Sequence, residues 1–189
     1  MILGFLDLKT IYLIVHIFGV ILGAGGAFTS DAMFFSTVKD GVVDKHELRF
    51  MRLGGRLVWL GILVMIISGI FLVSTDPVKY LSSSKFLVKI TVVGVIIING
   101  IIFHFLHLPF LKKHLNLKFS KSKTFIKNTS FLMASGALSM VSWITAVILG
   151  MLKHVPYTYF EILSVYITLV LVAVTGSFVT RKKILNLKD

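Results

Sequence analysis

The chain has 189 residues, 56% of them hydrophobic, and a mean hydropathy of +0.93, which excludes an ordinary soluble domain. It contains no cysteine, so a disulfide framework, a thiolate metal site and a cysteine nucleophile are excluded as well. The net charge of +12 would suit nucleic-acid binding in a soluble protein, but the positions of the charges point to a membrane instead.

Five segments are long and apolar enough to be membrane spans, which need about 20 mainly apolar residues each. Backbone groups in hydrocarbon must be hydrogen-bonded within their own segment, so each span is expected to be a helix. The sequence therefore predicts an all-α integral membrane bundle of five transmembrane helices in a single domain, residues 1–189. The expected spans are 11–28, 57–73, 86–108, 131–152 and 159–179.

The lysines and arginines predict the direction of the spans. Fifteen of them lie in the loop between spans one and two, the loop between spans three and four, and the tail, whereas the opposite side carries four. Positive loops stay in the cytoplasm, so we expect the N-terminus outside and the C-terminus inside a prokaryotic plasma (inner) membrane. The basic loops then touch membrane lipid, and no nucleic-acid partner is expected.

His16 is the first candidate functional residue, because an ionisable side chain at membrane depth is costly. Its helical face continues through Gly19, Gly23 and Gly26. An imidazole can ligate iron, and a stripe without side chains would let a flat macrocycle lie against the helix. Gly19 and Gly23 also form the small-residue spacing that suits close packing of a neighbouring helix. The sequence leaves both interpretations open.

Lys89 is the second candidate, one turn inside the third span and four residues beyond Lys85. Spans one and three run in the same direction, so Lys89 and His16 are expected at depths about one turn apart. A deprotonated Lys89 could ligate the same metal as His16, and a charged one could pair with a carboxylate of a substrate or cofactor. Alternatively, its side chain extends to the membrane surface.

A second polar group is expected at the cytoplasmic ends of spans two and three. Arg52 and Arg56 open span two, and His104 and His107, three residues apart, are expected to share one helix face. This group suits a clamp for a carboxylate or haem propionate, a second ligand site, or plain interfacial anchoring. Asp31, placed at the end of span one, is expected to pair with Arg52 or Arg56.

Other polar residues in the spans have structural explanations. Hydrogen bonds between helices are expected from Asn99, Ser139, Ser142 and Trp143. An aromatic belt near the outer boundary is expected from Tyr12, Tyr80, Tyr157, Tyr159 and Tyr166. Paired intramembrane carboxylates, which would suggest a proton or cation carrier, are absent from the pattern.

Three segments resemble the HemJ-type protoporphyrinogen oxidases and the related CopD-like group of predicted integral membrane proteins. The first, 11–19, carries His16 in its helix. The second, 51–57, carries the arginines that enter helix two and is followed by Ser68-Gly69. The third, 86–93, carries Lys89. The resemblance covers residues 10–108, and this chain adds a fifth helix to the family's usual four.

The resemblance implies a haem b with His16 and Lys89 as the matching ligands, and His104 is an alternative second ligand. It also implies a membrane electron acceptor such as quinone and a porphyrin substrate, with oxidation of protoporphyrinogen IX as the family's reaction. The predicted function is therefore a haem-b-binding membrane redox protein. Its expected cofactor contacts are His16, Gly19, Gly23, Arg56, Lys89 and His104.

Two other function classes stay open. A small transporter or channel would use His16 and Lys89 as polar groups along a pathway. An accessory subunit of a larger complex would use the glycine stripe and the fifth span as contact surfaces. A homo-oligomer is open as well.

Overall fold

The computed structural model describes residues 7–117, 123–153 and 155–186. The described chain is 88% helix and has five helical spans long and apolar enough to cross a membrane, which confirms the predicted helical bundle. The spanning elements are α1 (Leu8–Asp40), α2 (Lys45–Ser74), α4 (Ser84–Ile102) with η1 (Phe103–His107) and α5 (Leu108–Lys113), α6 (Lys123–Met151) and α7 (Tyr159–Asn186). A short helix, α3 (Pro77–Leu81), connects α2 to α4.

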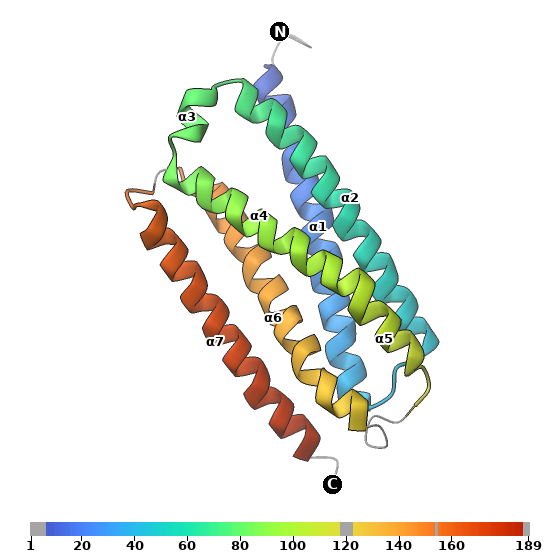
Figure 1. The fold of residues 1–189 in the computed structure, drawn as a ribbon. Helices are drawn as coiled ribbons and strands as arrows, with labels where there is room; N and C mark the ends of the chain where they lie inside the picture. Colours follow the sequence, from blue (N-terminus) through green and yellow to red (C-terminus); the bar gives the residue numbers. More distant parts are fainter. Residues whose placement is uncertain (1–6, 118–122, 154, 187–189) are drawn as a thin grey trace.

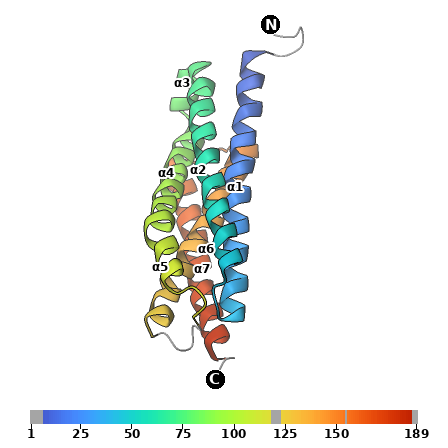
Figure 2. The same cartoon turned by 90° about the vertical axis from the view of Figure 1, so that its right-hand side faces the viewer.

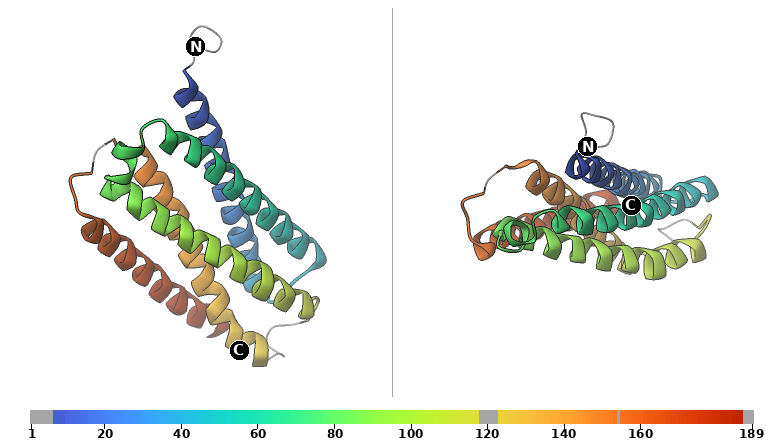
Figure 3. Two further views of the ribbon diagram at one scale, coloured as in Figure 1. Left: turned by 45° about the horizontal axis from the view of Figure 1, so that its top comes forward. Right: turned by 90° about the horizontal axis from the view of Figure 1, so that it is seen from above.

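The bundle has an upper end, where α1, α4 and α7 begin, and a lower end, where they finish (Figure 1). Because the number of spans is odd, the start of α1 and the finish of α7 lie at opposite ends. Helix α2 lies at one edge and α7 at the other, next to α6 (Figure 1). In the view turned by 90°, α1 lies at one side and α4 at the other (Figure 2). Helix α4 runs obliquely across the front of α6 and α1, as the views from the front and from above agree (Figures 1 and 3).

The connection between α1 and α2 is shorter than the hydropathy pattern predicts. The expected spans leave residues 29–56 as the connection, but α1 continues to Asp40 and α2 begins at Lys45. Caps set these ends. Gly41, in the left-handed conformation at φ 77°, closes α1 with its N–H on the Thr37 carbonyl, and Asp44 and Glu47 form a reciprocal capping box for α2.

Helices α1 and α2 approach so closely that their backbones touch. A Cβ atom added at Gly61 would lie 2.6 Å from the Gly19 carbonyl oxygen, and one at Gly26 would lie 2.6 Å from the Gly54 oxygen. Real side chains do not tolerate such distances, so these positions need glycine. Dispersion forces between closely packed surfaces are the main attraction between helices in lipid, and this pair therefore anchors the bundle.

Two apolar clusters fill the bundle. The upper cluster includes Met65, Val92, Ile96 and Trp143. The lower cluster includes Phe34, Met51, Leu111 and Met133. Below it, the Asn116 N–H donates to the Val43 carbonyl at 2.8 Å and ties the α1–α2 connection to the segment after α5. A cavity lies between the two clusters and is lined by residues of both.

Candidate functional site

His16 is held from one side by α2. Its Nδ1 lies 3.0 Å from the Met65 carbonyl oxygen and 3.1 Å from the Ser68 hydroxyl oxygen. The carbonyl can only accept, so Nδ1–H donates to it. Nε2 has no hydrogen-bond partner among the described residues, and it is not enclosed. Ligating histidines use this arrangement, with one ring nitrogen fixed by a carbonyl and the other free.

The structure brings Lys89 within electrostatic reach of His16, as the shared depth predicted. Its side chain is half-buried, and Nζ would lie 4.0 Å from a Cβ added at Gly150 of α6. The two residues come from α1 and α4 and lie in the upper half of the bundle. One imidazole and one amine are the donors present there. No group of three or more histidine, aspartate or glutamate side chains that could hold a metal was found among the described residues.

The glycine stripe of α1 is filled by neighbouring elements. A Cβ at Gly19 would lie 2.8 Å from the Met65 nitrogen, and one at Gly23 would clash with the Trp143 ring. Helix α2 and Trp143 thus occupy the space that the missing side chains leave. The geometry therefore supports close helix packing as the role of the glycine stripe.

The lower polar group is not assembled as the sequence predicts. Arg52, Arg56 and His104 are exposed on the outside of the bundle. The expected pairing of Asp31 with an arginine is wrong, because α1 continues past Asp31 and buries its carboxyl inside the bundle, whereas both arginines face outward from α2.

The prediction that His104 and His107 share one helix face is also wrong, because both residues lie in η1. In a regular α-helix, residues three apart lie on one face, but η1 is a π-helical turn, which widens the helix and changes the direction of the side chains. His107 is 4% exposed, while His104 points outward. Pro109 follows at the start of α5, where its missing N–H removes one regular helix bond. Turns of this kind are frequent at functional sites.

Asp31 and His107 line one partly open cavity, which we call the lower chamber. Its volume is about 50 Å³. Asp31 Oδ2 and His107 Nε2 are both buried without a hydrogen-bond partner in the described part of the chain. The Ser139 side chain lies beside the Asp31 carboxyl. The other polar or aromatic residues that line the chamber include Ser30, Trp59, Asn99, Phe103, Ser135 and Trp143.

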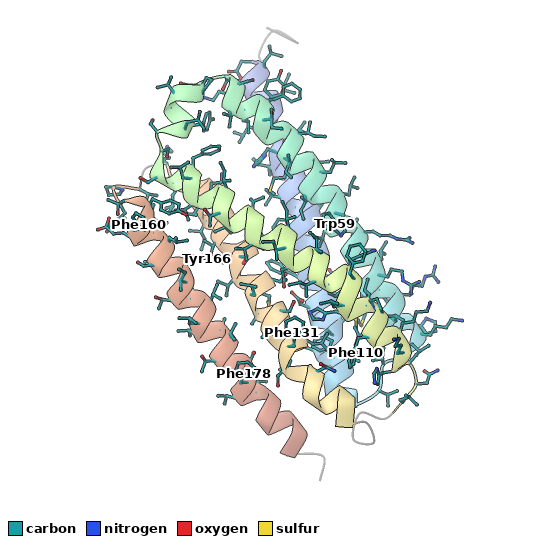
Figure 4. All side chains as sticks on the ribbon, viewed as in Figure 1. Trp59, Phe110, Phe131, Phe160, Tyr166 and Phe178 are labelled. Carbon is teal, nitrogen blue, oxygen red and sulfur yellow. The ribbon has the colours of Figure 1, made fainter. Side chains whose placement is uncertain are left out.

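Aromatic rings hold His107 in place. Its ring centroid lies 5.0 Å from that of Phe131 on α6 and 6.3 Å from that of Phe103 in η1, both at steep angles. Figure 4 shows Trp59 on α2 and, nearer the lower end, Phe131 on α6. The imidazole is therefore packed against aromatic rings, and its Nε2 is buried without a hydrogen-bond partner among the described residues.

The remaining polar residues of the chamber satisfy one another. Asn99 donates to the Ser135 carbonyl at 3.1 Å and accepts from the Ser135 hydroxyl at 2.7 Å, which confirms its predicted role between helices. The Ser30 hydroxyl donates to the Met51 carbonyl.

Tyr166, expected in the aromatic belt, is instead buried. Its hydroxyl lies 2.8 Å from the Ser142 hydroxyl, because α7 turns this residue toward α6.

Comparisons with protein-family models, with curated proteins and with solved structures found no match for this chain. Its fold and site define a multi-pass helical membrane bundle with half-buried His16 and Lys89 above and a cavity lined by Asp31 and His107 below. Sequence reasoning singled out Asp31 and His107 separately. It did not join them, because the π-turn that aims His107 inward leaves no mark in the hydropathy pattern.

Proposed function

We propose that this protein is a small transporter or channel of the prokaryotic plasma membrane, and that it moves a small cation or a proton through the lower chamber. One observation carries the proposal. Asp31 on α1 and His107 in η1 both line the chamber. Each has a buried polar atom without a hydrogen-bond partner in the described part of the chain. Such groups are costly at membrane depth and are retained where they serve transport.

The dimensions of the chamber support a small cargo. A volume of about 50 Å³ admits water or a bare ion but not an organic solute, since ligand pockets for such molecules measure about 300–1,000 Å³. Residues of both apolar clusters contribute to the lining of the chamber.

Reconstitution into sealed liposomes tests the proposal. A potassium diffusion potential would drive entry, and internal dyes would report protons, Na⁺ and K⁺ separately. We expect one of these fluxes to exceed that of protein-free liposomes and to fall in Asp31→Asn. Liposomes that conduct none of the three ions would refute a transport function.

A second candidate function is a haem-b redox protein, as the resemblance to the HemJ-type group implies. The hydrogen bond from His16 Nδ1–H to the Met65 carbonyl supports this candidate, because it leaves Nε2 available as an iron ligand. Haem would supply one-electron chemistry, and His16 and Lys89 would be the residues that hold it. Arg56 is a distant propionate partner, since 12 residues of α2 separate it from Ser68, a length of about 18 Å.

Visible spectra of the purified protein, reduced minus oxidised, test this candidate. A b-type spectrum in the wild type that is lost in His16→Ala, but kept in the exposed control His46→Gln, would support haem bound at His16. A colourless wild type from cells supplied with haem precursor would rule the candidate out. If the spectrum is found, porphyrinogen oxidation with a quinone acceptor is the next assay.

A further inference from the structure

We infer that the lower chamber is a proton site, in which a few ordered waters connect the Asp31 carboxyl to the His107 imidazole. The inference rests on the proposed transport function and names the substrate class of the same site. The observations behind it are the volume of the chamber, the supply of polar atoms around it, and the apolar clusters at its two ends.

The chamber is large enough and polar enough to hold water. A buried water needs about 10–15 Å³ of such volume, so about 50 Å³ has room for three to five. A water also needs two to four polar partners. Asp31 Oδ2 and His107 Nε2 lack protein partners, and the Ser139 hydroxyl beside Asp31 adds a third polar group. Waters that bridge these atoms would satisfy both orphaned groups at once.

The donor atoms do not suit a metal cation. Calcium takes six to eight oxygen ligands and magnesium near-ideal octahedral oxygen geometry. The free oxygen in the chamber is that of one carboxylate, because Asn99 and Ser135 are bonded to each other and Ser30 to the Met51 carbonyl. An imidazole nitrogen is a poor partner for such hard ions. A proton needs only one acceptor atom at each end of its path.

Asp31 and His107 are the ionisable residues among those that line the chamber. The lining contributed by α2 is Gly55, Val58 and Trp59, and that from α6 is apolar apart from serines and Trp143. Arg52 and Arg56 face away from the chamber. No other ionisable side chain therefore lines the chamber, so Asp31 and His107 are the two residues there that can exchange a proton.

The transfer is balanced without an oxidant or reductant. The O–H bond of the Asp31 carboxyl breaks, each bridging water accepts one proton and passes on another, and an N–H bond forms at His107 Nε2. No electrons are gained or lost, and the net change is the transfer of one proton from Asp31 to His107. The lower cluster separates His107 from the lower end, so release needs an opening of that cluster around Leu111.

The test uses the full-length protein in liposomes with an internal pH dye, with wild type, Asp31→Asn, His107→Gln and the exposed control His46→Gln. We expect proton flux in the wild type and the control. We expect at least about a 100-fold loss in the two chamber variants, because a positioned acid–base group contributes about that factor or more. Sodium or potassium flux that depends on Asp31, without proton flux, would overturn the proton site and leave the transport function standing.

Infrared spectroscopy of the detergent-purified protein gives a readout that does not depend on transport. The carboxyl band assigned to Asp31 by its loss in Asp31→Asn should shift in His107→Gln and after exchange into D₂O. A band indifferent to His107 would overturn the water link, whatever the flux. If His107→Gln elutes as aggregate, Ser139→Ala replaces it, because the loss of that hydroxyl should shift the same band.

Discussion

At the residue scale, Gly61 decides how closely α1 and α2 approach. Replacing it with alanine would place a methyl group against the Gly19 oxygen at 2.6 Å and against the Gly23 backbone. Both neighbours are backbone atoms that cannot rotate away, so the helices must separate. We expect Gly61→Ala to destabilise the bundle by about 1–3 kcal/mol, the usual cost of overpacking. Thermal denaturation in mild detergent measures the loss.

Gly94→Ala is the matched control. It makes the same chemical change inside another span, but a Cβ there would have nothing within 4 Å. Alanine favours helix over glycine by up to about 1 kcal/mol, so Gly94→Ala should be neutral or stabilising. Equal losses in both variants would mean that the α1–α2 contact is looser than described.

His107→Phe separates stability from function. The ring is clamped between Phe103 and Phe131, and phenylalanine would keep these contacts without the unpartnered Nε2. Phenylalanine cannot bond the water that we infer at Nε2, and the loss of such a bond costs about 1–3 kcal/mol. We expect a small decrease in melting temperature together with loss of proton flux. Unchanged stability together with unchanged flux would contradict the water link.

The candidate site shows what sequence patterns contain and what they omit. The neighbourhood of His16 and Lys89 could be predicted, because both depths follow from counting residues along parallel spans. The chamber could not. It depends on Asp31 facing inward from a helix that runs past the expected end of its span, and on the direction of His107 after a π-turn. A hydropathy profile averages over many residues and does not show the direction of a single side chain.

At the element scale, α7 is the most weakly attached span. Only 11% of the residues in its apolar stretch are buried inside the bundle. Two hydroxyl contacts hold it: Tyr166 to Ser142 at 2.8 Å, and Tyr159 to Thr91 at 3.0 Å. Ser142 already donates to the Leu138 carbonyl, so Tyr166 is the donor in the first. Besides these two contacts, Ile162 and Tyr166 pack in the upper cluster and attach α7 to the bundle.

Tyr166→Phe should weaken α7 by about 0.6 kcal/mol, the average for a hydrogen bond between membrane helices. Denaturation of Tyr166→Phe, Ser142→Ala and the double variant forms the measurement. The two single losses should not add, because both remove the same bond. Full additivity would show that the two hydroxyls do not interact. Tyr157→Phe, at an exposed position before α7, is the control.

Element boundaries illustrate a further limit of the sequence. All five spans were predicted, because about 20 consecutive apolar residues leave few alternatives in a chain this hydropathic. Their ends were not. Charged residues at 45–49 suggested a loop, yet the Asp44–Glu47 capping box draws them into the first turns of α2. Helices extend beyond the hydrocarbon wherever caps permit, and apolar content does not record where they stop.

At the scale of the whole molecule, the charges make a directional prediction. The lower end carries fifteen lysines and arginines by position in the chain and the upper end four. The positive-inside rule then puts the lower end, with the lower chamber nearer to it, in contact with the cytoplasm. The chain has no cysteine, so a single introduced thiol reports its own side without background.

Val78→Cys in α3 and Lys113→Cys at the end of α5 test this orientation, since both positions are exposed and lie at opposite ends of the bundle. A membrane-impermeant maleimide should label Val78→Cys in intact cells, and Lys113→Cys only after permeabilisation. The reverse pattern would invert the topology and with it the direction of release from the chamber. In that case the lower apolar cluster would face the outside, and the proton relay would open away from the cytoplasm.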